Sequence, residues 1–309
     1  MSTQNWGIII NPKSGKKKFR RQRRLLFKTL RNNNITFDYR ITQFVGHASE
    51  IARYYVENGY KNILVLGGDG TVSETVNGIF SAKIDNTADL TLALIPRGTG
   101  NDWARFWGLT RDGKKSLEVF LRGKTQIIDI GKIDYSIEKK QFSHFFINSI
   151  GFGLDAKVVD VTHKLKNFFG SHSFLYFIAL LTAVFTYRSH KLSITSHEKT
   201  FRSRMFTMNI ANGCYSGGGL KQNPNAVPTD GLLDVMLASV PTFWDIITAI
   251  TALVRGKFLE HHIISSFRTQ KLQIICDRKA QIEADGILIN GFNPFTISIL
   301  PNAIKMLVP

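Results

Sequence analysis

The chain has 309 residues, 43% of them hydrophobic and 20% charged, and a formal net charge of +17 at pH 7. This composition is typical of folded proteins with a sizeable core, and the length allows one large or two ordinary domains. The two cysteines, Cys214 and Cys276, have no metal-ligand spacing and are too few for a disulfide framework, so a reducing cytoplasm is expected.

The N-terminal segment carries much of the positive charge. Its first 31 residues hold ten Lys or Arg and no Asp or Glu. Such a segment suits an anionic membrane surface, a polyphosphate or nucleic acid. No nucleic-acid-binding motif accompanies it, and aromatic residues are not interleaved with it, so we expect no nucleic acid partner. A solvated helix face with Leu26 and Leu30 on its buried side is an equally good interpretation.

No segment predicts a signal peptide or a membrane-spanning helix. The first ten residues lack the charged segment and apolar run of a signal peptide. The most apolar run, FLYFIALLTAVFTY at Phe174–Tyr187, has 14 residues and is too short to span a bilayer comfortably. We therefore expect a cytoplasmic protein that is soluble or peripherally associated with a membrane.

In the first part of the chain, strand-like apolar runs alternate with segments of helical length. The strand-like runs are WGIII (6–10), FDYRIT (37–42), NILVLGG (62–68) and LTLALIP (90–96). The helical segments are expected around residues 16–31, 47–58 and 71–82. This alternation predicts βαβ units, which build a parallel sheet with helices on its faces.

From QIIDIGKI (126–133) onward, the pattern changes to β-rich runs. Helical stretches are expected near residues 157–187 and 242–257, and the other runs suit a largely antiparallel sheet. We therefore predict two domains, an α/β domain over residues 1–129 and a mostly antiparallel β domain over residues 130–309. Return of the C-terminal strand to the first domain is left open.

A glycine-rich turn follows the third strand-like run in VLGGDGTVSETVNG, Val65–Gly78. Gly67, Gly68 and Gly70 allow a sharp turn and the close approach of a ligand to main-chain N–H groups. A helix that begins near Thr71 would direct the positive end of its dipole at an anion. The turn therefore predicts a phosphate-binding cradle.

Asp69 lies in the middle of this cradle. A carboxylate beside a polyphosphate is repelled unless a divalent cation lies between them, so Asp69 predicts bound Mg²⁺. Two further clusters follow strand-like runs, PRGTGNDWA at Pro96–Ala104 and NPKSGKK at Asn11–Lys17. Since ligands bind where the strands of an open α/β sheet end, we expect these turns to line one cleft.

Together these motifs resemble those of the diacylglycerol/sphingosine lipid kinase family. NPKSG, GGDGTVSETVNG and PRGTGNDWA occur in the family's order, followed by IGFGLDA (150–156), NGCYSGGGLKQNPNAVPTDGLLDV (212–235) and IEADG (282–286). The resemblance covers nearly the whole chain. It implies a nucleotide-binding α/β domain and a β-sandwich domain with ATP in the cleft between them. The implied enzyme is a kinase that phosphorylates a hydroxyl of a membrane lipid such as diacylglycerol.

The resemblance also implies roles for individual residues. Nucleotide contacts are implied for Asn11, Thr42, Gly68, Asp69, Gly70, Thr71, Val72, Ser73, Glu74 and Thr99. The implied acidic network linked to Mg²⁺ comprises Asp69, Asp102 and Asp129. Asp155 matches a position that faces the lipid head group. VPTDGL resembles a structural Mg²⁺ loop, whose ligands would be the Asp230 carboxylate and the carbonyls of Val227 and Leu232.

In such an enzyme the lipid hydroxyl attacks the γ-phosphate in line, while the protein positions the reactants and neutralises charge. Lys13 or Lys16 would add positive charge. A carboxylate must accept the hydroxyl proton, and Asp285 is the first candidate, with Asp69 second. The family usually reads DGE at this motif, whereas this chain reads DGI, so Ile287 leaves Asp285 as the motif's only base.

Two other classes of function stay open. NAD kinases and phosphofructokinases also use a GGDG turn, although GTGND and DGLLD fit the lipid kinases better. A non-catalytic module that binds lipid or nucleotide is the second class, and the intact Asp69 and Asp285 argue against it.

The expected partners are a lipid substrate and an anionic membrane surface, and a homodimer is left open. The adjacent His261 and His262 would point to opposite faces of a strand, which is poor geometry for one metal ion.

Overall fold

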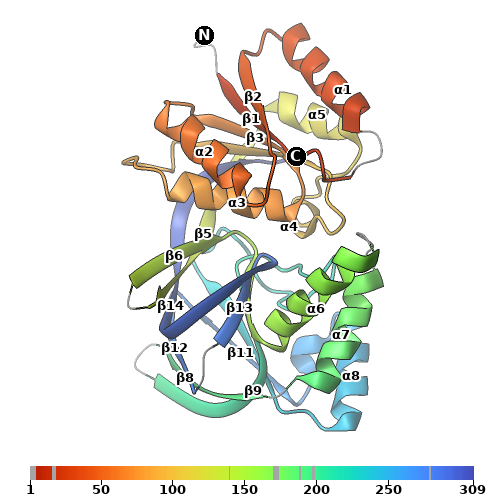
Figure 1. The fold of residues 1–309 in the computed structure, drawn as a ribbon, viewed down its shortest axis with the longest axis vertical. Helices are drawn as coiled ribbons and strands as arrows, with labels where there is room; N and C mark the ends of the chain where they lie inside the picture. The colour runs from red at the N-terminus through yellow and green to blue at the C-terminus, as the bar shows by residue number, and fades with distance from the viewer. Residues whose placement is uncertain are drawn as a thin grey trace. The chain divides into compact units, whose positions relative to one another are not determined.

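The computed structural model describes residues 5–15, 19–138, 140–169, 174–187, 189–196, 199–277 and 280–309. The chain divides into two compact units, whose elements are labelled in Figure 1. The N-terminal unit comprises Met1–Ile128 and Asn302–Pro309, and the C-terminal unit comprises Asp129–Pro301. Lys16, which was expected to add charge to the phosphate site, lies outside the described residues.

The N-terminal unit is built around a sheet of parallel strands. They are β1 (Trp6–Ile10), β2 (Phe37–Ile41), β3 (Asn62–Gly67), β4 (Thr91–Pro96) and the end of β14 (Ile287–Leu307). The strands lie in the order β2-β1-β3-β4-β14, and neighbouring strands pair in parallel. Both β1 and β3 are buried along their whole length. Their sequences read as continuous apolar runs because both faces of these strands are covered.

Helices cover the two faces of this sheet. They are α1 (Phe19–Asn32), α2 (His47–Glu57), α3 (Asp69–Phe80), α4 (Asp102–Phe106) and α5 (Gly113–Arg122). Leu26 and Leu30 of α1 belong to the same buried cluster as Ile8 of β1, so the expectation that they form the buried side of α1 is confirmed. On the opposite face, the ring of Tyr55 in α2 packs over Gly7, where a Cβ atom would lie 2.6 Å from the ring.

The C-terminal unit is a mostly antiparallel β structure. Its strands are β5 (Thr125–Ile137, which begins in the N-terminal unit), β6 (Lys140–Phe146), β7 (Ser149–Gly153), β8 (His190–Ser196), β9 (Lys199–Ala211), β10 (Leu233–Ser239), β11 (Ile264–Thr269), β12 (Lys271–Cys276), β13 (Ala280–Ala284) and β14. Antiparallel pairing joins β5 to β6, β7 to β9 and β13, β9 to β10, β10 to β11, β8 to β9 and β12, and β14 to β12 and β13.

Helices of the C-terminal unit are α6 (Leu154–Phe169), α7 (Phe174–Thr186) and α8 (Phe243–Val254), with a 3-10 turn η1 at Phe258–Glu260. The strands enclose a buried cluster that includes Phe146, Phe152 and Phe295. In β12, buried and exposed residues alternate, which is the pattern of a strand with one face on a core and one face in solvent.

The structure confirms the predicted two-domain organisation, with a mostly antiparallel β domain in the C-terminal part. The helical stretch expected near residues 157–187 consists of two helices, and α6 begins earlier, at Leu154. β14 runs from the C-terminal unit into the N-terminal unit, where Lys305 and Met306 pair with β4. Within the described parts of the chain, no helix combines the length and apolar character needed to cross a bilayer.

Candidate active site

The glycine-rich turns after β3 and β4 lie in direct contact. An ideal Cβ atom on Gly68 would lie 2.6 Å from the Cα of Gly98, and one on Gly98 would lie 2.7 Å from the Cα of Gly68. Side chains cannot be accommodated at these distances, so both positions require glycine. By contrast, a Cβ atom on Gly70 would have nothing within 4 Å. The two turns therefore form a main-chain cradle in which Gly98 packs against Gly68, while the space beside Gly70 is empty of protein atoms.

Asp69 begins α3 and connects this helix to the turn after β4. Its Oδ1 accepts a hydrogen bond of 3.2 Å from the main-chain N–H of Trp103. Burial raises the pKa of the Asp69 carboxyl, and main-chain N–H groups, those of Trp103 and Asn101 first, act in the opposite direction. Asp69 is half-buried, and Asp102, the first residue of α4, is buried. The structure thus brings Asp69 and Asp102 together on contacting turns.

The loop after β1 reaches the same place through Asn11. Its Nδ2 donates a hydrogen bond of 2.9 Å to Thr71 Oγ1, and its Oδ1 accepts one of 2.9 Å from the main-chain N–H of Lys13. Asn11 therefore holds this loop against the first turn of α3. The three motifs meet at the carboxyl ends of β1, β3 and β4, which is the edge where open α/β sheets bind ligands.

Arg97 is a site residue that the sequence analysis missed. Its guanidinium is buried and donates hydrogen bonds to the carbonyl oxygens of Ser14, at 3.1 Å, and Gly15. Arg97 therefore ties the loop after β1 to the turn after β4. The available signal was its place in PRGTG directly after an apolar strand, because a charged side chain that is buried needs hydrogen-bonding partners.

Glu74, an expected nucleotide contact, has both carboxylate oxygens engaged within the protein. Oε1 accepts a hydrogen bond of 2.9 Å from the main-chain N–H of Gly46, and Oε2 accepts one of 3.2 Å from Ala48. These N–H groups belong to the start of α2, so Glu74 satisfies main-chain donors that the helix itself leaves open. In this structure Glu74 acts as a cap for α2.

Of the other expected nucleotide contacts, Thr42, Val72 and Ser73 are buried, whereas Thr99 is exposed. Val72 and Ser73 of α3 have no exposed surface. Thr42 is buried after β2, and its main-chain N–H donates a hydrogen bond of 2.9 Å to the Ile10 carbonyl. The Thr99 carbonyl accepts a hydrogen bond from the Arg111 guanidinium. Contact of these residues with a nucleotide stays a prediction.

Asp129 is the first residue of the C-terminal unit, where its described contacts hold a loop. Its Oδ2 accepts a hydrogen bond of 2.8 Å from the main-chain N–H of Gly231, and its own N–H donates one of 2.9 Å to the Pro228 carbonyl. Its carbonyl accepts from Asn212 Nδ2 at 3.0 Å. The contacts of Asp129 therefore fix the VPTDG loop on β5.

Asp285 and Gly286 form the turn between β13 and β14. Both have positive φ, 49° and 82°, as in the type I′ hairpin turn that an Asp-Gly pair favours. The Asp285 carboxylate accepts three main-chain hydrogen bonds, from the N–H groups of Ile147 at 2.8 Å, Asn148 at 2.9 Å and Ser149 at 3.0 Å. The side chain thus anchors the β6–β7 connection to the hairpin.

Two buried carboxyl groups of the C-terminal unit face each other across Gly151. A Cβ atom on Gly151 would lie 2.9 Å from Glu283 Oε1 and 3.0 Å from Asp155 Oδ2. Burial, and secondarily the charge of Asp155, raises the pKa of Glu283 to about 8. Burial also raises the pKa of Asp155. No role for Glu283 was predicted from the sequence, because only the folded chain brings it next to Asp155.

Asp155, in the first turn of α6, is held by a set of polar side chains. Its Oδ1 accepts hydrogen bonds from Thr207 Oγ1 at 2.9 Å and Gln222 Nε2 at 3.4 Å, and its Oδ2 accepts one from Asn209 Nδ2 at 3.0 Å. Asn209 in turn accepts a hydrogen bond of 2.7 Å from Asn223. This network fixes the orientation of the carboxylate expected to face a lipid head group.

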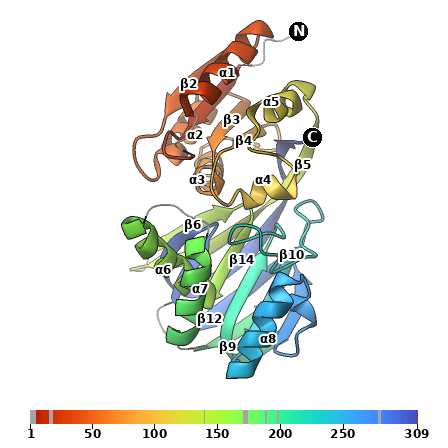
Figure 2. The ribbon, with the colours of Figure 1, turned by 90° about the vertical axis from the view of Figure 1, so that its right-hand side faces the viewer.

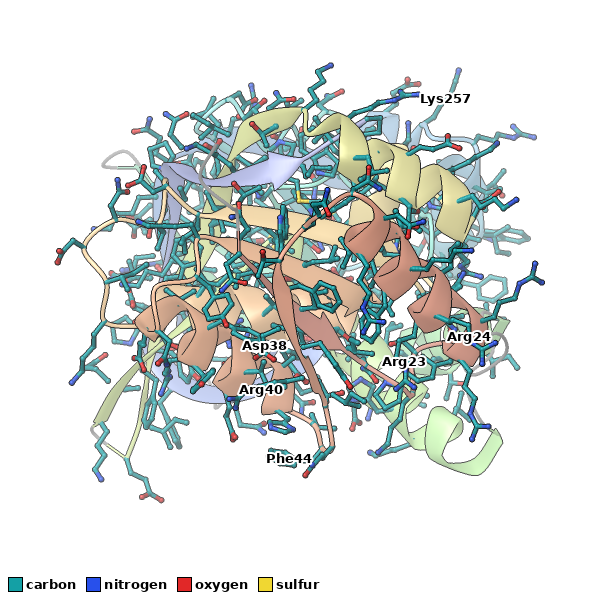
Figure 3. The ribbon with its side chains drawn as sticks, turned by 90° about the horizontal axis from the view of Figure 1, so that it is seen from above. Arg23, Arg24, Asp38, Arg40, Phe44 and Lys257 are labelled. Carbon is teal, nitrogen blue, oxygen red and sulfur yellow. The ribbon has the colours of Figure 1, made fainter. Side chains whose placement is uncertain are left out.

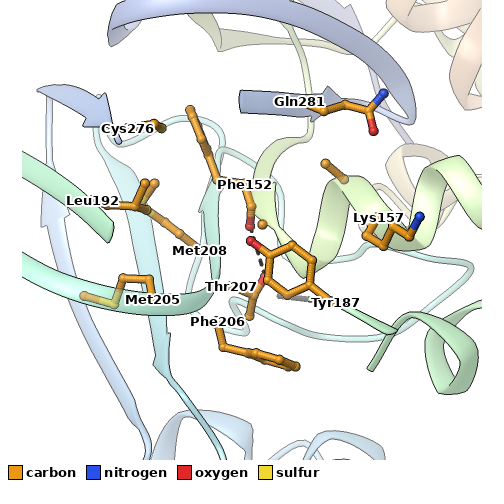
Figure 4. A pocket seen from close by; sticks show the side chains of 12 residues that line it. Phe152, Lys157, Tyr187, Leu192, Met205, Phe206, Thr207, Met208, Cys276 and Gln281 are labelled. Carbon is orange, nitrogen blue, oxygen red and sulfur yellow. Dashed lines mark hydrogen bonds between the residues drawn. The ribbon is translucent and has the colours of Figure 1, made fainter. Parts of the chain in front are cut away.

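A pocket of about 200 Å³ adjoins this network. Its walls include the apolar side chains Phe152, Leu192, Met205, Phe206 and Met208, together with the ring of Tyr187 (Figure 4). Thr207 also lines the pocket, and its hydroxyl contacts both the Phe152 carbonyl, at 3.3 Å, and Asp155. The pocket therefore has largely apolar walls, with Lys157 and Gln281 as polar side chains in the lining, and Thr207 connects it to a buried carboxylate.

The structure gives Asp230 a protein cation as its partner. The Arg268 guanidinium donates to Asp230 Oδ2, and it also contacts Asp234 Oδ2 at 3.2 Å. The other Asp230 oxygen accepts a hydrogen bond of 3.0 Å from the main-chain N–H of Leu232, and the Val227 carbonyl accepts one of 2.8 Å from Thr229. With its carboxylate engaged in this way, Asp230 does not fit a bound Mg²⁺ unless Arg268 moves away.

The expectation that His261 and His262 point apart is wrong. They follow the 3-10 turn η1 instead of lying on a strand, and their rings stack with centroids 4.6 Å apart. His262 Nε2 lies 2.9 Å from Asp245 Oδ1, and ligand atoms of the three residues lie within 4.8 Å of one another. The strand rule of alternating faces does not apply to a turn.

Two family models cover the chain. The diacylglycerol kinase catalytic domain matches residues 5–133, and the YegS C-terminal NAD kinase beta sandwich-like domain matches residues 148–308. The chain belongs to the diacylglycerol kinase-like lipid kinase family. The resemblance recognised in the sequence motifs is therefore confirmed.

Relatives of known name match over most of their length. A diacylglycerol kinase from Bacillus subtilis (strain 168) is 28% identical over 90% of this chain and 88% of its own. A diacylglycerol kinase from Mycobacterium tuberculosis (strain H37Rv) is 29% identical over 87% of this chain and 85% of its own. A crystal structure of a diacylglycerol kinase from Bacillus anthracis has a TM-score of 0.77 at 20% identity, covering 100% of this chain and 98% of that one. The structural match supports the fold.

Proposed function

We propose that this lipid kinase family member transfers the γ-phosphate of ATP to a hydroxyl of a membrane lipid such as diacylglycerol. The observation that carries the proposal is the pair of contacting glycine turns at Gly68 and Gly98, with the half-buried Asp69 joining α3 to α4. Such a main-chain cradle at the start of a helix suits phosphate groups. The names of the relatives support diacylglycerol as a substrate.

ATP and Mg²⁺ are the proposed cofactors. Gly68 and Gly70 would hold phosphate oxygens, because neither residue has a side chain that covers its main-chain N–H group. A Cβ atom on Gly70 would have nothing within 4 Å, which leaves room for a ligand there. Carboxylates are hard oxygen ligands of the kind Mg²⁺ prefers, so Asp69 and Asp102 fit this ion. When bound, the ion supplies charge neutralisation at the phosphates. A position of ATP between the two domains stays a prediction.

In this proposal Asp69 accepts the proton of the lipid hydroxyl, and Asp285 is the second candidate for this role. The Asp285 carboxylate already accepts three main-chain hydrogen bonds, which suit an anchoring role. Main-chain N–H groups, those of Trp103 and Asn101 first, also donate to Asp69, but burial raises its pKa, which makes it a stronger proton acceptor. Asp155 would bind the lipid head group, next to the apolar pocket.

Phosphorylation of NAD⁺ is the second candidate function. It is favoured by the description of the matched C-terminal model, which is NAD kinase beta sandwich-like. Both activities would use the same phosphate cradle, so the acceptor distinguishes them.

Transfer of labelled γ-phosphate from ATP tests the proposal directly. The purified protein is assayed with diacylglycerol, a sphingoid base and a polyprenol in detergent micelles, and with NAD⁺ in solution. We expect a labelled lipid product. Label in NAD⁺ alone would replace the proposal by the NAD kinase function, and saturable ATP binding without transfer to any acceptor would indicate a binding module.

Asp69→Asn is the variant that tests the active-site assignment. It keeps the shape of the side chain but removes its charge, so we expect turnover to fall by at least ~100-fold while the variant remains folded. The exposed Asp85→Asn is the matched control, for which we expect unchanged turnover. Near-normal turnover of Asp69→Asn would remove Asp69 from the mechanism.

A further inference from the structure

Helix α8 is apolar around most of its circumference, although only one side of it is buried in the protein. Its twelve residues, FWDIITAITALV, contain three polar side chains. On the inner side, Ile246 packs against the cluster formed by α6 and α7, while Ala249 and Leu253 pack against residues of β10 and of the segment after α8. A helix that is hydrophobic on all sides normally has all sides covered.

The opposite side of α8 carries large apolar side chains in solvent. We call Val240, Phe243, Trp244, Ile247 and Val254 the outer face of α8. Phe243 is 57% exposed, and Trp244 and Val254 are both 72% exposed. The helical residues among them recur at helical spacing, which places them along one side of the helix. Figure 2 shows α8 at the surface of the C-terminal unit. Monomeric soluble proteins rarely expose such a contiguous apolar surface without a function for it.

The exposed charges directly after α8 are positive, and Glu260 in the following 3-10 turn is the nearest exposed acidic residue in the sequence. Within residues 243–257, the exposed charged side chains are Arg255 and Lys257. Asp245, the acidic residue of the helix, is turned toward Thr242 and His262, which hold its carboxylate at 2.8 Å and 2.9 Å. The whole chain carries a formal net charge of +17. An anionic surface therefore meets no exposed negative charge on this helix.

We propose that the outer face of α8 binds the interfacial region of an anionic phospholipid bilayer. Trp and Phe side chains are favoured at this depth, and Arg255 and Lys257 would remain among the lipid head groups. At about 1.5 Å per residue the helix would be roughly 18 Å long, so it lies on the bilayer and does not span it. A second copy of the chain is the less suitable occupant, because the large net charge repels it.

This inference deepens the proposed function, since a kinase of membrane lipids must work at a bilayer. It is tested with vesicles that contain no diacylglycerol, so that its outcome does not depend on catalysis. The kinase assay in detergent micelles tests the function separately. A failure of one experiment is therefore distinguishable from a failure of the other.

Tryptophan fluorescence gives the direct measurement. Trp6 and Trp103 are buried, and Trp107 is half-buried, whereas Trp244 is exposed. On adding phosphatidylcholine vesicles with phosphatidylglycerol, we expect a blue shift of the emission and quenching by brominated lipid. In Trp244→Phe, both signals should be lost while sedimentation with vesicles persists.

A second variant measures the contribution of the outer face to binding. Phe243→Ser combined with Ile247→Ser should weaken vesicle sedimentation by at least about tenfold, because two large apolar side chains no longer enter the interface. Their exposure predicts unchanged thermal stability. Leu121→Ser is the matched control, since Leu121 is an exposed apolar residue on α5, and it should bind like the wild type.

Two results would overturn the proposal. One is an emission spectrum of the wild type that does not change with anionic vesicles. The other is a dimer in light scattering that Phe243→Ser with Ile247→Ser converts to a monomer, which would make a second copy the occupant of the outer face.

Discussion

The carboxylate of Asp285 accepts hydrogen bonds from three consecutive main-chain N–H groups, and this environment decides what the residue does. Hydrogen bonds of this kind to a charged group are among the strong ones in proteins. Asparagine offers one acceptor oxygen and an NH₂ group that would face the N–H donors. The sequence alone presented Asp285 as a free carboxylate beside Ile287, whereas the fold surrounds it with donors.

Asp285→Asn should therefore destabilise the protein. We expect a loss of about 1.5–3 kcal/mol in the free energy of unfolding, the size expected for hydrogen bonds to a charged group. Urea unfolding measures it, with the exposed Asp85→Asn as control. If Asp285→Asn unfolds at the same urea concentration as the wild type but is inactive, Asp285 has a catalytic role in place of the anchoring role.

Glu283 gives the protein a pH-dependent stability. Its pKa in the folded protein is about 8, above its ordinary value of 4.5, so folding favours the protonated form. The stabilisation is complete below the unfolded pKa and is lost as the pH rises through the folded pKa. From pH about 6 to about 8 we expect stability to fall by roughly 1.4 kcal/mol per pH unit at most.

Glu283→Gln isolates this effect, because glutamine is neutral at every pH. Its unfolding free energy should vary less than that of the wild type between pH about 6 and about 9. Urea unfolding at several pH values provides the comparison. Parallel pH curves for the two proteins would show that Glu283 is ionised at neutral pH in the folded state.

At the scale of elements, the phosphate cradle depends on how closely two turns approach. Gly68 precedes α3 and Gly98 follows β4, and each occupies space that a Cβ atom on the other would need. Arg97 and Asn11 add the loop after β1 to the same assembly. Three βα connections are thus fixed together by main-chain contact and side-chain hydrogen bonds.

Gly68→Ala should separate the two turns. The added Cβ would lie 2.6 Å from the main chain at Gly98, and we expect a destabilisation of about 1–3 kcal/mol together with weaker ATP binding. Gly70→Ala is the matched control for stability, because a Cβ there meets nothing within 4 Å and alanine is the better helix former. Equal stability of the two variants would contradict the close contact of the turns.

At the scale of the whole molecule, positive charge is the dominant feature. Helix α1 presents exposed Arg20, Arg21 and Arg24 on the side away from Leu26 and Leu30. Figure 3 shows Arg23 and Arg24 on this helix. Such a cationic surface is attracted to anionic lipids over about a Debye length. A peripheral association with a membrane is our proposal for its role.

Neutral substitutions at Arg20, Arg21, Arg23 and Arg24 test this role. We expect binding to anionic vesicles to weaken with rising salt in the wild type, because the Debye length is about 8 Å at physiological ionic strength and shorter above it. The variant should bind more weakly and depend less on salt. Vesicle sedimentation across a salt series measures both, and identical curves would mean that α1 is a solvated face.

The amino-acid sequence by itself determined the elements and the motifs. Apolar runs such as NILVLG and the glycine turn after it are local signals, because strand periodicity and turn formation depend on neighbouring residues. The change of pattern near residue 130 indicated two domains for the same reason. The motifs also identified the family, since their order along the chain is a property of the sequence.

Only the tertiary structure decided which polar groups meet. Asp285 is hydrogen-bonded to residues 136 to 138 positions earlier in the chain, and Asp155 and Glu283 face each other from different elements. Arg97 belongs to the site through hydrogen bonds to Ser14 and Gly15, which no local pattern encodes. The role of a carboxylate depends on its burial and on its hydrogen-bond donors, and both come from distant parts of the chain.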